Sequence, residues 1–118
     1  MKILIVDDHL ISLKLLEAII SNIDKKIIIH VAKNTNEAIE LLNDNNYCAA
    51  FVDIQMPYNG INLIAYIKKT FHTCVTIVTT AHAMKGDKKK YLNTGFDYYI
   101  SKPININQIK NIIMELYE

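Results

Sequence analysis

Acidic residues close two of the short apolar stretches of this chain. Asp53 follows the run 48–52, and Asp7 and Asp8 follow the run 3–6. Short apolar runs that end in polar residues are typical of buried strands. If the two strands are parallel neighbours, their carboxyl ends bring three carboxylates to one edge of a sheet. Close carboxylates repel one another, so we expect either a bound cation or a raised pKa on at least one of them.

The expected cation is a divalent metal. Magnesium suits the three acids best because it is a hard ion that prefers oxygen ligands and is usually held by one or two carboxylates. Manganese is the alternative ion. The sequence offers neither a thiolate nor a close pair of histidines beside the acids, which disfavours zinc.

A carboxylate beside such a metal can attack phosphorus and form an acyl phosphate. The phosphoryl oxygens then need partners that stabilise their charge. Lys102 follows the apolar stretch 98–101 and can supply a positive charge, whereas Thr80 follows the stretch 74–79 and can supply a hydroxyl donor. These residue types indicate phosphoryl chemistry at Asp53.

Short apolar runs alternate with amphipathic stretches along the whole chain, which predicts five strand–helix units. The expected strands cover residues 2–7, 27–32, 48–53, 74–79 and 98–100. The second helix should begin after Asn34 and the fifth after Asn105, because asparagine is a good N-cap. The fourth helix, expected at 84–93, has few apolar residues and should be the least stable element.

Two helices have a buried face that can be predicted from helical spacing. In the first helix this face is Ile11, Leu15, Ala18 and Ile19. In the fifth helix it is Ile106, Ile109, Ile113 and Leu116.

The strands are apolar almost throughout, so both faces of their sheet must be covered by helices. We therefore predict an α/β fold, a three-layer α/β/α sandwich of the flavodoxin-like (βα)5 type. Right-handed crossovers favour a five-stranded parallel sheet in the order 2-1-3-4-5. The winding direction then changes between the first and third strands, where the three acids would meet.

Composition limits the classes of protein to consider. The chain has 118 residues, which fits one domain over residues 1–118. Its net charge is +1 with acids and bases interspersed, which argues against direct nucleic-acid binding. No apolar run approaches the roughly 20 residues that a membrane helix needs, so we expect a cytoplasmic protein without membrane insertion.

With these motifs in place, the chain resembles a response regulator receiver domain over its whole length. The matching pieces are Asp7-Asp8, Asp53 followed by Met56-Pro57, Thr80-Ala81, and Tyr99 three residues before Lys102-Pro103. The sequences 80–87 and 101–104 are most similar to receivers attached to hybrid histidine kinases.

The resemblance implies a role for each acid. Asp53 would accept a phosphoryl group, in a two-component system or phosphorelay, from a sensor or hybrid histidine kinase or a histidine phosphotransfer protein. Asp8 and Asp53 would bind magnesium directly, Asp7 would hold it through water, and the backbone carbonyl of Gln55 would complete the shell. A receiver catalyses only its own phosphorylation and dephosphorylation, so it is not a turnover enzyme.

The resemblance also implies a switch. Thr80 would move toward the phosphoryl group and Tyr99 would turn inward, which would alter the surface of the fourth helix, fifth strand and fifth helix. The peptide bond before Pro103 would be cis. Gln55 and His82 are candidates for tuning the lifetime of the phosphoryl group. The chain would act on another protein, as a monomer or as a weak phosphorylation-dependent dimer.

Two other functions stay open. The loop after Met56-Pro57 is one residue shorter than is usual in receivers and has Asn59 before Gly60, so a degenerate receiver that binds partners without phosphorylation is one alternative. The other is a phosphatase similar to haloacid dehalogenases. That family has a second aspartate two residues after its nucleophile, and here this place is taken by His9.

Overall fold

The fold is a parallel sheet of five strands. The computed structural model describes residues 1–55, 60–81 and 95–117. The strands are β1 (Lys2–Val6), β2 (Ile28–Ala32), β3 (Ala49–Asp53), β4 (Val75–Thr80) and β5 (Tyr98–Ser101). All paired strands are parallel, and their order is 2-1-3-4-5, as predicted. The predicted strand ends were correct to within one residue.

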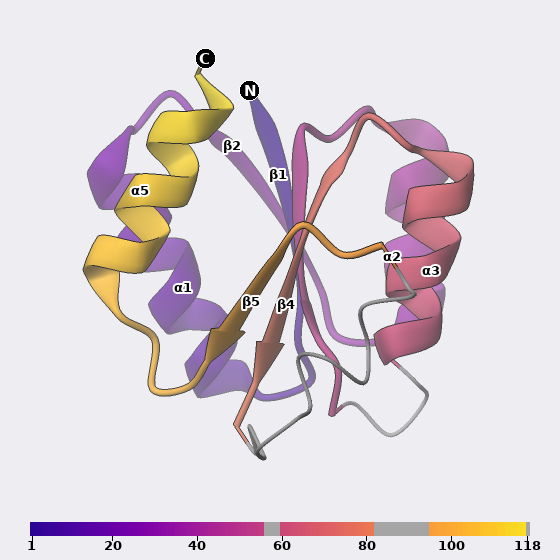
Figure 1. The fold of residues 1–118 in the computed structure, drawn as a ribbon, viewed down its shortest axis with the longest axis horizontal. Helices are drawn as coiled ribbons and strands as arrows, with labels where there is room; N and C mark the ends of the chain where they lie inside the picture. Colours follow the sequence, from indigo (N-terminus) through magenta and orange to yellow (C-terminus); the bar gives the residue numbers. More distant parts are fainter. Residues whose placement is uncertain (56–59, 82–94, 118) are drawn as a thin grey trace.

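Helices cover both faces of this sheet. Among the described residues they are α1 (Leu10–Ile23), α2 (Thr35–Asp44), α3 (Gly60–Thr70) and α5 (Ile106–Leu116). Helices α1 and α5 lie on one face and α2 and α3 on the other (Figure 1). This arrangement confirms the three-layer, flavodoxin-like prediction. The helix predicted at 84–93 lies outside the described residues.

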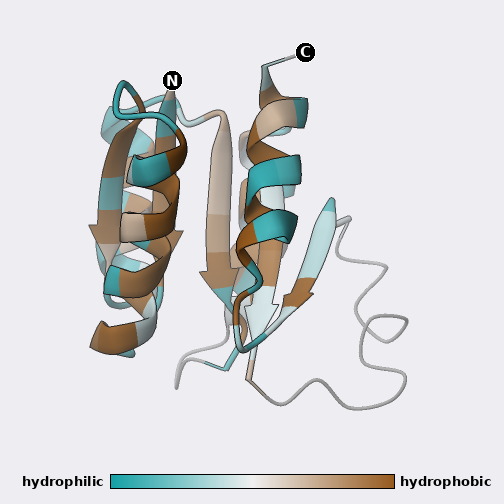
Figure 2. Ribbon diagram, turned by 90° about the vertical axis from the view of Figure 1, so that its left-hand side faces the viewer, coloured by the Kyte–Doolittle hydropathy of each residue, from teal (hydrophilic) through white to brown (hydrophobic). Residues whose placement is uncertain are grey.

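The core consists of two hydrophobic clusters, one on each face of the sheet. Alternate residues of each strand enter different clusters because strand side chains point to opposite faces. Ile3 and Phe51 pack toward α1 and α5, whereas Leu4 and Val52 pack toward α2 and α3. The two helices in front in Figure 2, α1 and α5, carry both hydrophilic and hydrophobic residues, as expected for helices with one buried side.

The buried face predicted for α1 was wrong except at Ile19. The structure buries Leu13, Leu16, Ile19 and Ile20. Ile11 is 75% exposed, Leu15 is 49% exposed, and Ala18 is also exposed. Apolar residues occur on most sides of this helix, so spacing alone fits more than one stripe. In α5, Ile106 is exposed and Ile112 is buried, while the other predicted positions are buried or partly buried.

Side chains cap the starts of two helices, as the sequence predicted. The Asn34 side chain accepts a hydrogen bond from the backbone N–H of Glu37 at 2.8 Å. The Asn105 side chain accepts from the backbone N–H groups of Asn107 and Gln108. These bonds satisfy N–H groups that have no partner inside the first turn of a helix.

The first residue of α3 lies against the end of β3. A Cβ atom added at Gly60 would be 2.1 Å from the backbone oxygen of Asp53 and 2.8 Å from the Cα atom of Ile54. Neither backbone atom can move without shifting Asp53 itself. Only glycine lets α3 begin this close to the strand that carries Asp53.

We therefore expect Gly60→Ala to lower the free energy of unfolding by about 1–3 kcal/mol or more, because the added methyl group overpacks a backbone contact. Urea denaturation measures this change. The control is Asn62→Ala, at an exposed position of the same helix, which should stay within about 0.5 kcal/mol of the parent. Equal effects of the two changes would contradict the contact at Gly60.

Candidate functional site

Three carboxylates meet at the carboxyl ends of β1 and β3. Asp7 and Asp8 follow β1 and Asp53 ends β3, and one oxygen of each lies within 4.8 Å of the others. The strands are hydrogen-bonded neighbours with Val6 opposite Val52, which brings the residues that follow them together. Asp7 and Asp53 are buried, whereas Asp8 is exposed. The acids expected at this switch point of the sheet do lie together.

Backbone N–H groups fix one oxygen of each buried acid. Oδ1 of Asp7 accepts from the N–H of His9 at 2.8 Å, and Oδ1 of Asp53 accepts from the N–H of Gln55 at 2.9 Å. In both cases the donor lies two residues after the acid, in the turn that leaves the strand. The turns therefore orient the carboxylates, and the two Oδ2 atoms face each other across the site.

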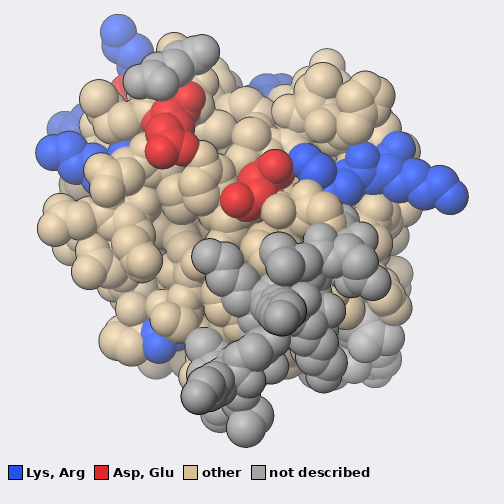
Figure 3. Space-filling model, viewed as in Figure 1, with Lys and Arg blue, Asp and Glu red and all other residues tan. Residues whose placement is uncertain are grey.

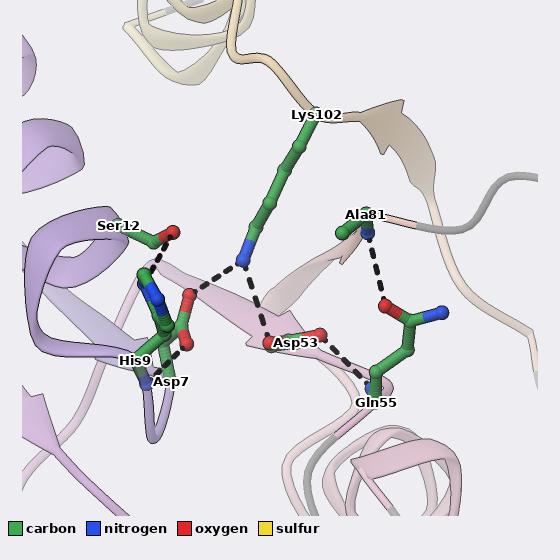
Figure 4. Close-up of polar contacts among 7 residues, drawn as sticks. All are labelled: Asp7, His9, Ser12, Asp53, Gln55, Ala81 and Lys102. Carbon is green, nitrogen blue, oxygen red and sulfur yellow. Dashed lines mark hydrogen bonds and ion pairs between the residues drawn. The ribbon is translucent and has the colours of Figure 1, made fainter.

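Lys102 reaches these Oδ2 atoms from the end of β5 (Figure 4). Its Nζ atom lies 2.9 Å from Oδ2 of Asp7 and 3.4 Å from Oδ2 of Asp53. Its backbone N–H donates to the carbonyl of Thr80 at 2.8 Å, which holds the start of the side chain beside β4. The Lys102–Pro103 peptide bond is cis, as predicted. Among the residues that the structure describes, Lys102 is thus the cation that pairs with both buried acids.

The environment of Asp53 raises the pKa of its carboxyl group. Burial has the largest effect, because it disfavours the charged form. The hydrogen bond from Gln55 and the charge of Lys102 act in the opposite direction, and the nearby charge of Asp7 adds to the effect of burial. One lysine therefore offsets only part of the cost of keeping Asp53 ionised.

A cavity of about 310 Å³ opens at this cluster of acids, and two of the three, Asp8 and Asp53, line it. Its lining residues are Asp8, His9, Ser12, Asp53, Gln55, Ala81 and Lys102. A larger cleft of about 780 Å³ lies at the other edge of the sheet, against Met1 and Tyr47, and no cluster of acids lines it. The smaller cavity is therefore the candidate site, because it brings the carboxylates of Asp8 and Asp53 together with the ammonium group of Lys102.

Of the remaining predicted residues, Thr80 and Tyr99 are not among those that line the cavity, and the others lie outside the described residues. Thr80 is buried at the end of β4, one residue beyond the partner of Asp53 in the sheet. Tyr99 is partly buried on β5, and its ring packs against Phe96 with 5.9 Å between the ring centroids. His82 and residues 56–59 of the shortened loop lie outside the described residues. The roles assigned to these residues stay predictions.

Two side-chain contacts at the cavity were not predicted from the sequence. Gln55 was expected to bind the metal through its backbone carbonyl and was a candidate for tuning the phosphoryl lifetime, but its contact with Ala81 was not predicted: its side-chain Oε1 accepts from the N–H of Ala81 at 3.1 Å. Ser12 lies with its Oγ 3.3 Å from Nδ1 of His9. The N-terminal position of Ser12 in an amphipathic helix after Asp7-Asp8 is the only signal in the sequence that could have pointed to it.

Comparison with known proteins agrees with this site. A family model described as the response regulator receiver domain matches residues 3–114. The chain belongs to this family. It is thus a receiver domain of the kind used in two-component and phosphorelay signalling.

Curated relatives of this receiver include separate regulators and hybrid kinases. Stress response regulator protein 1 of Lodderomyces elongisporus is 33% identical over 122 residues, which cover 99% of this chain and 34% of that protein. Signal transduction histidine-protein kinase BarA of Escherichia coli K12 is 31% identical over 117 residues, covering 97% of this chain and 12% of the kinase. The chain therefore spans about a third or less of the length of these relatives.

Solved structures share the fold over nearly the whole chain. A CheY-like receiver domain protein from Methanospirillum hungatei has a TM-score of 0.86 and 26% identity, covering 98% of this chain and 93% of its own. Response regulator TrrA from Thermotoga maritima was solved in complex with Mg²⁺-BeF. It has a TM-score of 0.84 and 26% identity, and the match covers 98% of this chain and 97% of TrrA. The likeness thus extends to a receiver solved with magnesium.

Two further features of the receiver concern membranes and nucleic acids. Within residues 1–55, 60–81 and 95–117, no helix is both long and apolar enough to cross a membrane. On the face drawn in Figure 3, the basic side chains stand at several separate places and acidic side chains lie among them. The described part of this face therefore has no continuous basic surface of the kind that binds nucleic acid.

The raised pKa of Asp53 predicts a pH dependence of stability. The folded state binds the Asp53 proton more tightly than the unfolded state, because the pKa is higher in the folded state. In metal-free buffer the free energy of unfolding should therefore fall as pH rises from 3.8, the usual pKa of aspartate, through the higher pKa of the folded state. Asp53→Asn should remove this fall and make the protein more stable than the parent at neutral pH. Denaturant titrations at several pH values measure both effects.

The control for this experiment is Glu40→Gln, which removes one negative charge from an exposed position of α2. Its stability should follow the pH dependence of the parent. A parent whose stability rises over the same pH range, or an Asp53→Asn variant that is less stable at neutral pH, would contradict the assigned shift.

Proposed function

We propose that this receiver is a phosphoacceptor and that Asp53 takes a phosphoryl group from a phosphohistidine. The donor is a sensor or hybrid histidine kinase or a histidine phosphotransfer protein. The observation that supports this most is the position of Asp53 beside two further carboxylates and 3.4 Å from the ammonium group of Lys102. The phosphorylated domain acts in the cytoplasm by protein contact, as a monomer or a weak phosphorylation-dependent dimer.

The chemistry requires an ionised Asp53. A carboxylate oxygen attacks phosphorus, the phosphorus–nitrogen bond to the donor histidine breaks, and the electron pair stays on the imidazole. The charge of Lys102 lowers the pKa of Asp53. Its Nζ atom already lies near Oδ2 of Asp53, so it can also pair with the negative oxygens of a phosphoryl group there. The hydroxyl group of Thr80 is a second proposed partner of the phosphoryl oxygens. These residues serve the domain's own phosphorylation and dephosphorylation and no external substrate.

The acids fit a magnesium ion because they offer three oxygen donors within 4.8 Å. We assign direct binding to Asp8, Asp53 and the backbone carbonyl of Gln55, and binding through water to Asp7. Magnesium held by these residues would supply positive charge that offsets the negative charge of the phosphoryl group. Lys102 forms its ion pairs with Asp7 and Asp53, so the exposed Asp8 can hold the metal without giving up an ion pair to this lysine.

The proposed output is a change at Thr80 and Tyr99. Thr80 ends β4 beside the cavity, and Tyr99 lies in the neighbouring strand β5, opposite Val78. A movement of Thr80 toward a phosphoryl group on Asp53 would leave space toward β5, and Tyr99 would turn into it. This movement would change the surface of β5, α5 and the segment between β4 and β5.

The direct test of this function is phosphorylation by a small phosphodonor. We expect the protein to gain one phosphoryl group in the presence of acetyl phosphate and magnesium, and to gain none when Asp53→Asn is treated in the same way. Mass spectrometry of the intact protein measures the gain. The Glu40→Gln variant should be phosphorylated like the parent.

No gain with any donor would instead favour a receiver that binds partners without phosphorylation. Steady release of phosphate from many small esters would favour a phosphatase. Either result would contradict the proposed function.

The metal assignment predicts different effects of two substitutions. Asp8→Ala should weaken magnesium binding at least about tenfold, because it removes a direct ligand. Lys102→Met should leave the affinity unchanged or raise it, because the ammonium group competes with the metal for the Asp53 carboxylate. Isothermal titration calorimetry measures both affinities. Equal losses in the two variants would contradict the roles given to Asp8 and Lys102.

A further inference from the structure

The side chain of Gln55 joins the ends of two neighbouring strands. Gln55 lies just after β3, and its Oε1 atom accepts a hydrogen bond from the N–H of Ala81, just after β4. The backbone N–H of the same residue donates to Oδ1 of Asp53. Figure 4 shows both bonds beside the cavity. One residue therefore contacts the nucleophile through its backbone and the end of β4 through its side chain.

The N–H of Ala81 is a donor that a phosphoryl group on Asp53 would compete for. Ala81 lines the same cavity as Asp53 and Lys102. A phosphoryl group carries its charge on three oxygens, and each oxygen needs a donor or a cation. Backbone N–H groups are well suited to this because they are already oriented. In the present structure, however, the hydrogen of this N–H points to Oε1 of Gln55.

We propose that the Gln55 side chain is a latch that occupies the Ala81 N–H until a phosphoryl group displaces it. This inference rests on the proposed function of Asp53. Gln55 is a positioning residue, since it acts through Ala81 and not on phosphorus. The latch opens without unfolding, because Gln55 is exposed and its carboxamide can bond to water once released. Its backbone, including the carbonyl group assigned to magnesium, stays in place when the side chain moves.

The latch lowers the affinity of the site for a phosphoryl group, because one hydrogen bond must break before another forms. Its effect should be that of one neutral hydrogen bond, which is about two- to tenfold in an equilibrium constant. We therefore expect Gln55→Met, which has a similar length and no oxygen, to bind beryllofluoride about two- to tenfold more tightly than the parent in the presence of magnesium. Beryllofluoride is the probe because it mimics a phosphoryl group on a carboxylate without a chemical step.

The affinity is measured by NMR titration of the ¹⁵N-labelled full chain, with the Ala81 amide as the spectroscopic signature. This amide should shift between the parent and Gln55→Met before any beryllofluoride is added, because its hydrogen-bond partner has changed. Gln55→Glu keeps an acceptor oxygen at the same place, so its affinity should not rise above that of the parent. The matched control is Gln108→Met, on the exposed face of α5, which should bind like the parent.

Two failures can be distinguished in this experiment. If the parent binds beryllofluoride and Gln55→Met binds it no more tightly than the parent does, the proposal of a latch is wrong and the phosphoacceptor function stands. If neither the parent nor any variant binds it, the phosphoacceptor function is wrong and the latch has no role. An increase in Gln55→Glu equal to that in Gln55→Met would also overturn the latch, because the acceptor oxygen would then be irrelevant.

Discussion

Repulsion among three carboxylates at one edge of the sheet is the constraint on which the site depends. Parallel neighbouring strands put their carboxyl ends together, and β1 and β3 both end in acid. Two unit charges about 4 Å apart interact by about 4 kcal/mol at an effective dielectric constant of about 20. The sheet cannot separate the acids without losing its register. A nearby cation or a raised pKa must therefore relieve the repulsion, and the site shows both, since Lys102 pairs with two of the acids and the pKa of Asp53 is raised.

The position of Lys102 depends on how the edge strand β5 is held. The carboxylate of Asp97, just before β5, accepts hydrogen bonds from the backbone and side chain of Thr76 and forms an ion pair of 2.8 Å with Lys68 on α3. These contacts join the start of β5 to β4 and to the helix behind it. At the other end, the N–H of Lys102 bonds to Thr80. A strand fixed at both ends delivers a flexible side chain to a defined place.

The sequence allowed the frame of the molecule to be predicted, but not its finer contacts. Continuous apolar runs and chain order were enough for the strands and for the meeting of the acids, because parallel pairing leaves few alternatives. The prediction of the buried face of α1 failed at most positions, because a helix with apolar residues on most sides can turn either Ile11 or Leu13 toward a sheet. The need for Gly60 and the bond from Gln55 to Ala81 depend on distances between separate loops. Spacing along the chain does not contain such distances.

The site combines fixed and exchangeable contacts, and this difference has consequences for signalling. Oδ1 of Asp7 and Oδ1 of Asp53 are held by backbone N–H groups of tight turns, and Gly60 sets the distance from α3 to β3, so the nucleophile cannot move far. The Lys102 ion pairs and the Gln55 side-chain bond connect residues on different strands and can exchange without disturbing either strand. If Asp53 is phosphorylated as proposed, the added charge would act on these exchangeable contacts. The contacts of Lys102 and Gln55 would then carry the response toward the ends of β5 and β4, where Lys102 and Ala81 lie.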